Sequence, residues 1–273
     1  VQGMEIVFHA GAWMGGHDPT GQQYAVTVEG TRNLLLAARR AAVSRVIHTS
    51  SVAALGVPQN LQGQPALIDE HHSWNFRQDY YPYGYAKYLA EQEVQKAVAM
   101  GLDVVIVNPT VVFGAGDIYR QAGSIITQVS QRRLSVATEG GINCVHIADV
   151  TDGHMAALAC GKSGERYIIG GENLTYLELL QMIAGAAGVP APNMVVPAWL
   201  LRFLSNPAQT MRAFLSLPVS PEMLHMAGIY FFYNLKKSET ELGLTIHRPV
   251  IDAISEALEW FQPEKSRTSK PVQ

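Results

Sequence analysis

Short apolar runs alternate along this 273-residue chain with longer segments whose apolar residues recur every three or four positions. The short runs predict buried strands, and the longer periodic segments predict helices. Strands are expected at Ile6–Ala10, Arg45–Ser50, Val104–Asn108 and Arg166–Ile169, and long helices at Gln22–Val43 and Tyr83–Met100. This alternation predicts an α/β fold with a parallel sheet.

The pattern changes after about Gly170, where helical segments separated by prolines replace the alternation of strand and helix. Thr175, followed by Glu178 three residues later, has the pattern of a capping box. The polar stretch 263–273 is expected to be a disordered tail. The helices expected in this half are Thr175–Ala187, Ala198–Leu217, Pro221–Tyr233, Lys236–Leu242 and Val250–Phe261.

Composition excludes several classes of protein. The formal net charge of −3 leaves no basic footprint for nucleic acid. Two cysteines cannot form a disulfide scaffold, and they lack metal-site spacing, so no metal is expected. His71 and His72 are interpreted as part of a solvated loop. Apolar runs end well before membrane-spanning length, and no signal-peptide pattern opens the chain. We therefore expect a soluble, cytoplasmic protein with no membrane partner.

Candidate chemistry lies at the start of the second long helix. The spacing of Tyr83 and Lys87 places both side chains on one helix face, one turn apart. A nearby ammonium favours a phenolate and moves the tyrosine pKa toward the range useful for acid–base catalysis. Ser51 follows a predicted strand, and ligands bind beyond the carboxyl ends of strands in open α/β sheets. The alternative is that Ser50 and Ser51 only cap the next segment.

Seven ordered stretches make the sequence similar to one enzyme family. Over about residues 4–190 it resembles the extended short-chain dehydrogenase/reductases, which include NAD-dependent epimerase/dehydratases and dihydroflavonol-reductase-like enzymes. Order and spacing agree across all the stretches, which is more specific than any one of them. They are Val7–Ala12, Val28–Leu35, His48–Gly56, Tyr83–Lys87, Val107–Gly114, Asn143–Val150 and Gly164–Gly171.

The resemblance implies a Rossmann-type, doubly wound parallel sheet, incomplete at its start, with a smaller and mainly helical C-terminal substrate lobe. Residues 1–116 and 142–170 would form the NAD(P)-binding domain, and residues 117–141 and 171–262 the substrate lobe. The family's glycine-rich fingerprint follows a strand that precedes this chain, so about three β–α units are expected to be missing. The strand Ile6–Ala10 is then expected at a sheet edge, with self-association and weak NAD(P) binding as consequences.

The resemblance also implies roles for the residues of the site. Tyr83 would be the general acid–base, Lys87 would lower its pKa and bind the nicotinamide ribose, and Ser51 would orient the substrate oxygen. Thr27 stands where the family usually has Asn, which puts one cofactor-linked contact in doubt. Besides Tyr83 and Lys87, the implied cofactor contacts are Ala10, Gly11 and Ala12 under the dinucleotide, Pro109 and Val112 beside the nicotinamide, and Ser124 at its carboxamide.

The implied function is an NAD(P)-dependent oxidoreductase that transfers hydride at a secondary alcohol or ketone. A nucleotide-sugar epimerase or dehydratase is the alternative within the class, and a non-catalytic dinucleotide sensor on the same fold is the alternative outside it. NAD and NADP are not separated by these residues. The resemblance further implies a homodimer in which the helices Gln22–Val43 and Tyr83–Met100 pair with their mates.

Overall fold

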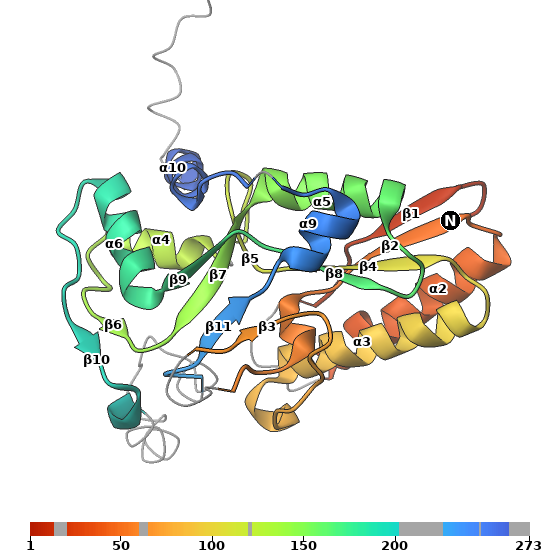
Figure 1. Ribbon diagram of the computed structural model, residues 1–273, viewed down its shortest axis with the longest axis horizontal. Helices are drawn as coiled ribbons and strands as arrows, with labels where there is room; N and C mark the ends of the chain where they lie inside the picture. The colour runs from red at the N-terminus through yellow and green to blue at the C-terminus, as the bar shows by residue number, and fades with distance from the viewer. Residues whose placement is uncertain (14–20, 60–64, 120–121, 202–225, 246, 262–273) are drawn as a thin grey trace, which may run out of the picture.

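A parallel sheet forms the centre of the computed structural model, which describes residues 1–13, 21–59, 65–119, 122–201, 226–245 and 247–261 (Figure 1). Its strands lie in the order β1-β2-β4-β8. All six residues of β4 are buried, as expected for a parallel strand covered on both faces. The strands are β1 (Ile6–His9), β2 (Arg45–Thr49), β4 (Val104–Pro109) and β8 (Arg166–Ile169). All four predicted strands and their parallel pairing are therefore confirmed.

Helices cover both faces of this sheet. On one face, α2 (Gly30–Arg40) and α3 (Pro82–Ala99) pack through Leu35 and Val94 against Val46 and Ile106. On the other face lie α5 (Ile147–Cys160) and α9 (Lys236–Leu242), as Figure 1 shows. The doubly wound arrangement that the resemblance implied is confirmed.

The first long helix is built in three pieces. α1 (Gln22–Tyr24) continues into a π-helical turn, η1 (Ala25–Glu29), and then into α2. The helix ends at Arg40 instead of Val43, because Ala42 adopts a positive φ of 52° that reverses the chain toward β2.

A second sheet lies beside the central sheet (Figure 1). It has the order β3-β11-β7-β5, with β9 antiparallel to β7. Buried apolar residues join its strands β5 and β7 to α4 (Gly123–Ser130), α6 (Tyr176–Ala187) and α10 (Val250–Phe261), on the left of Figure 1. Its strands are β3 (Leu67–Ile68), β5 (Val111–Phe113), β7 (Gly141–His146), β9 (Glu172–Thr175) and β11 (Tyr230–Tyr233). A short parallel pair joins β6 (Ala137–Thr138) to β10 (Val195–Val196).

The predicted helix Pro221–Tyr233 is wrong in its described part. Residues 230–233 form β11, which lies between β3 and β7. Four consecutive aromatic residues favour an extended backbone, and two neighbouring strands supply their hydrogen-bond partners. Residues 202–217, 221–225 and the expected tail 263–273 lie outside the described residues.

Three other helices predicted in this half, Thr175–Ala187, Lys236–Leu242 and Val250–Phe261, match the structure. α9 and α10 have the predicted bounds. Thr175 and Glu178 form the predicted capping box at the start of α6, with both reciprocal hydrogen bonds present.

Candidate active site

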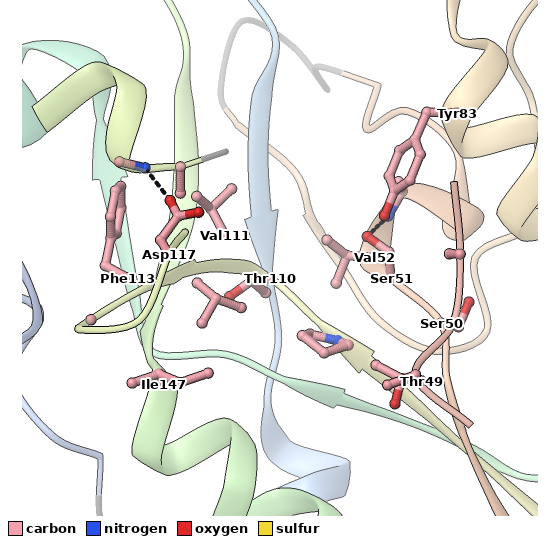
Figure 2. Close-up of a pocket in the computed structure, with 18 of the residues that line it drawn as sticks. Thr49, Ser50, Ser51, Val52, Tyr83, Thr110, Val111, Phe113, Asp117 and Ile147 are labelled. Carbon is pink, nitrogen blue, oxygen red and sulfur yellow. Dashed lines mark hydrogen bonds between the residues drawn. The ribbon is translucent and has the colours of Figure 1, made fainter. Parts of the chain in front are cut away.

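A cavity of about 670 Å³ opens at the carboxyl ends of the central strands. Its wall takes residues from the segment after β1, the end of β2, the β4–β5 connection and the first turns of α3. Figure 2 shows Tyr83 and Ser51 on one side and Phe113, Val111 and Asp117 on the opposite side. The position agrees with the rule that ligands of open α/β sheets bind beyond the strand ends.

Ser51 has two contacts. It is the N-cap of the 3₁₀ turn η2 (Val52–Leu55), where its Oγ accepts a hydrogen bond from the Ala53 amide at 3.2 Å. It is also hydrogen-bonded to the Tyr83 hydroxyl across the pocket wall (Figure 2). The Ser51 side chain therefore both caps η2 and contacts the candidate catalytic tyrosine.

The start of α3 is fixed against η2. Pro82 occupies the first helical turn, where its missing N–H costs no helical hydrogen bond. A Cβ on Gly84 would lie 2.7 Å from the Ala53 carbonyl oxygen, so only glycine permits this approach of helix to turn. The close packing brings the Tyr83 hydroxyl to Ser51.

Burial dominates the ionisation of Tyr83. Burial raises the pKa of the phenol above its usual value, and the hydrogen bond with Ser51 opposes this shift. The sequence predicted a lowering by Lys87, but the Lys87 ammonium is not among the groups that shift this pKa. Tyr83 is therefore a protonated phenol at neutral pH, the state that donates a proton.

Lys87 is buried one turn further along α3. Its Nζ donates a hydrogen bond to the Thr49 carbonyl oxygen at 3.1 Å. Burial lowers the pKa of the ammonium to about 8, and the charge of Glu91 opposes this shift. An ammonium has three donors, so hydrogens beyond the one given to Thr49 remain for hydroxyl groups of a ligand in the cavity that Lys87 lines.

The implied cofactor residues do not all reach the cavity. Ala10, Ala12, Pro109 and Val112 line it together with Tyr83 and Lys87. The wall contains neither Gly11 nor Ser124, and Ser124 is exposed in the first turn of α4. Four small or apolar side chains and a lysine donor fit the apolar ring and the ribose hydroxyls of a nicotinamide nucleotide.

Thr27 has a structural partner. Its Oγ1 accepts a hydrogen bond from the Trp13 amide at 3.0 Å, and its carbonyl oxygen accepts one from the Thr31 hydroxyl at 2.6 Å. The side chain thus holds the segment that leaves β1. Thr27, which stands where the family usually has Asn, thus makes a structural contact through its hydroxyl.

Charge is scarce in the described cavity wall. Lys87 and Asp117 are the charged residues there, and the Asp117 carboxylate accepts a hydrogen bond from the Gly123 amide at 2.8 Å (Figure 2). Apart from Asp117 and Thr110, the wall opposite Ser51 is mainly apolar, with Val111, Phe113 and Ile147 among its larger side chains. This part of the wall suits an uncharged, largely apolar group of a bound ligand.

Sequence reasoning missed a buried carboxylate behind the cavity. Glu91 is 3% exposed and lies four residues after Lys87 on α3. It contacts side chains from three strands or strand ends, at Ser50, Asn108 and Arg166. Its spacing from Lys87 was the available signal, but a carboxylate at that spacing also suits an exposed helix face.

The geometry of the described residues gives neither a metal site nor a membrane-spanning helix. In the part of the chain that the structure describes, no three His, Cys, Asp or Glu side chains come together as metal ligands. None of the helices there combines the length and the apolar content that crossing a bilayer requires. His146 caps α5, where its Nδ1 accepts a hydrogen bond from the Ala148 amide at 3.0 Å.

Comparison with known proteins agrees with this geometry. Residues 1–170 match the model of the "NAD dependent epimerase/dehydratase family". The chain is 33% identical to a protein of Synechocystis sp. named "Putative dihydroflavonol 4-reductase", over 96% of this chain and 77% of that protein.

Two crystal structures extend the similarity to the fold. The structure of gox2253 has 36% sequence identity and a TM-score of 0.80, covering 95% of this chain and 79% of that one. The structure of PA4631, a nucleoside-diphosphate-sugar epimerase from Pseudomonas aeruginosa, has 25% identity and a TM-score of 0.76, covering 95% and 76%.

Proposed function

Because this chain belongs to the NAD-dependent epimerase/dehydratase family, we propose that it is an NAD(P)-dependent oxidoreductase that interconverts a ketone and a secondary alcohol. The observation that carries the proposal is the hydrogen-bonded pair Tyr83–Ser51 beside the buried Lys87, all lining one cavity at the strand ends. A dinucleotide sensor has no need of such a proton-transfer group.

Three side chains share the chemistry in this proposal. Bound NAD(P)H supplies the hydride. The Ser51 hydroxyl holds the carbonyl oxygen of the substrate, and the Tyr83 phenol donates the proton that this oxygen takes up. A phenol with a raised pKa suits that step, because it stays protonated at neutral pH. The Lys87 ammonium binds hydroxyl groups of the ribose and keeps a positive charge beside the site.

The substrate proposed for this site is an uncharged carbonyl compound with an apolar body. A nucleotide sugar would bring a second diphosphate in addition to that of the cofactor, and proteins bind diphosphates with Arg, Lys or backbone amides. Among the described residues of the cavity wall, Lys87 is the one basic side chain, and Asp117 adds a negative charge. Val111, Val112 and Phe113 offer apolar contact area instead.

The test is product analysis with both cofactors. The protein is incubated with NADH or NADPH and a panel of apolar ketones, and in parallel with nucleotide sugars and NAD. Oxidation of the reduced cofactor with formation of one alcohol enantiomer supports the proposal. Epimerised sugar without net change of cofactor supports the epimerase instead. Cofactor binding with no product from either panel identifies a sensor and overturns the proposal.

A homodimer is proposed for the assembly. α2 and α3 pack side by side on one face of the sheet, and Val26 in η1 is exposed beside them. Pairing of these helices with a second copy would cover that apolar surface. Light scattering after size exclusion at micromolar concentration should give twice the chain mass, and Val26→Glu should shift it toward the monomer.

A further inference from the structure

The carboxylate of Glu91 lies behind the cavity, on the same face of α3 as Tyr83 and Lys87. Its Oε1 accepts hydrogen bonds from the Ser50 hydroxyl at 2.5 Å and from the Asn108 side-chain amide at 2.7 Å. Its Oε2 accepts one from Arg166 Nη1 at 3.2 Å. Both oxygens of a carboxylate that is 3% exposed are therefore used.

The partners of Glu91 lead directly to Ser51. Asn108 Nδ2 donates one hydrogen to Glu91 and the other to the Ser51 carbonyl oxygen at 2.8 Å. Ser50, the residue before Ser51, is bound to the same carboxylate. Two connections thus fix the Ser50–Ser51 segment relative to α3, the helix that carries Tyr83.

We propose that Glu91 is a positioning residue, whose buried carboxylate sets the separation of the Ser51 and Tyr83 hydroxyls and holds a negative charge behind Lys87. The inference rests on the proposed function, because these hydroxyls matter only if they act on a substrate oxygen. A rotation of α3 or a shift of the segment by about 1 Å would separate the two donors and lower the rate.

Arg166 sets Glu91 apart from an ordinary buried ion pair. Its Nε and Nη2 donate to the Glu70 and His72 carbonyl oxygens, each at 2.7 Å, so the guanidinium is anchored to the chain independently of Glu91. Arg166 is therefore a fixed partner, which holds the Glu91 carboxylate in place beside the strand ends.

The charge of Glu91 acts on Lys87 within a defined set of neighbours. His9 on β1 and His48 on β2 face the ammonium, and burial first and the charge of Lys87 second lower the pKa of both imidazoles, so they are neutral at pH 7. Tyr83 is a neutral phenol. Among the described residues, Glu91 is the carboxylate whose charge raises the pKa of Lys87 against burial.

Glu91→Gln tests both effects, because it keeps the shape and removes the charge. We expect kcat for the ketone to fall by about tenfold or more with KM changed by less than about threefold, since the lost interaction acts at the reacting atoms. The alkaline limb of the pH profile should move to lower pH, because Lys87 loses its proton more readily without the carboxylate. Glu91→Asp should restore part of the rate.

Glu93→Gln is the matched control. Glu93 lies on the same helix, is also a buried carboxylate, and pairs with Arg32 and Lys96 away from the cavity. The Glu93→Gln substitution should leave kcat and the pH profile unchanged. Equal losses in Glu91→Gln and Glu93→Gln would assign Glu91 a structural role only and overturn the proposal.

Asn108→Ala covers the case in which Glu91→Gln fails to fold. It cuts the connection from Glu91 to the Ser51 carbonyl but keeps the carboxylate, so kcat should fall while the alkaline limb stays in place. Unchanged kcat in this variant would contradict the proposal.

A readout without substrate separates this inference from the proposed function. The pKa of Lys87 is measured by NMR on protein with isotope-labelled lysine, the signal being assigned by its loss in Lys87→Met. A lower Lys87 pKa in Glu91→Gln, but not in Glu93→Gln, supports the electrostatic part even if no ketone is reduced. An unchanged Lys87 pKa in Glu91→Gln overturns it.

Discussion

The hydroxyls of Tyr83 and Ser51 are hydrogen-bonded to each other in the wall of the cavity, although 31 residues separate them along the chain (Figure 2). Ser51 reaches this position as the N-cap of η2, and Tyr83 reaches it from the first turn of α3. One oxygen atom of a substrate placed between them could accept from both hydroxyls.

Removing the Tyr83 hydroxyl should abolish most of the activity. Tyr83→Phe deletes one oxygen and leaves the ring packing, so the fold is retained while the proton donor is lost. Turnover should fall by about 10²–10⁴-fold, the usual contribution of a positioned acid or base. The measurement is steady-state reduction of the best ketone, with circular dichroism to check the fold.

Tyr85→Phe is the control for Tyr83→Phe. The Tyr85 ring packs against Trp74 and Tyr88 and does not line the cavity, so its hydroxyl should be dispensable. A loss of less than tenfold in Tyr83→Phe would show that another group transfers the proton.

The ionisation of Lys87 should limit the enzyme on the alkaline side. The pKa of Lys87 is about 8, and that of Tyr83 is raised above 10.0, so the ammonium loses its proton first as the pH rises. For ketone reduction, kcat/KM should fall above a pH of about 8. In Lys87→Met the limb should instead follow the Tyr83 phenol, so it should move upward while cofactor binding weakens at every pH.

Lys96→Met is the matched control for the pH profile. Lys96 is an exposed lysine on the same helix, paired with Glu93, and its removal should leave the alkaline limb in place. Persistence of a limb near pH 8 in Lys87→Met would assign that ionisation to a different group.

Gly114 should be essential for the shape of the cavity wall. Its φ is +146°, and a Cβ there would lie within 2.3 Å of Ile147 Cγ2, so Gly114→Ala combines backbone strain with a clash. Gly116, with a φ of +95° and no atom near its missing Cβ, supplies a control with strain alone. Gly114→Ala should destabilise the fold by about 1–3 kcal/mol more than Gly116→Ala, as for overpacked sites. Denaturant unfolding of both variants measures the difference, and equal losses would exclude the clash.

The open edge of β1 should promote self-association of this 273-residue chain. In the part of the chain that the structure describes, β1 is an end strand of the order β1-β2-β4-β8, with Ile6 and Phe8 exposed by 41% and 46%. Apolar edge strands pair with other chains, and a lysine on the edge prevents this. Phe8→Lys should therefore reduce species larger than a dimer in light scattering. Met155→Lys, at an exposed position on α5, should not. Equal behaviour of the two variants would place the association elsewhere.

The sequence alone determined the features that depend on neighbouring residues. The strands of the central sheet are short apolar runs, and a run such as Val104–Val107 is buried whichever strand it pairs with. The capping box of Thr175 and the bounds of α9 and α10 follow from hydrogen bonds within a few residues. The four-residue spacing of Tyr83 and Lys87 fixes their common helix face in the same way.

Tertiary structure decided what depends on partners distant in sequence. Residues 230–233 became a strand because β3 and β7 lie on either side to pair with them. Glu91 is buried because Ser50, Asn108 and Arg166 converge on it from other elements. The direction of the Tyr83 pKa shift was set by burial, which no spacing reveals. Desolvation and pairing depend on everything that surrounds a group, so they arise only when the chain has packed.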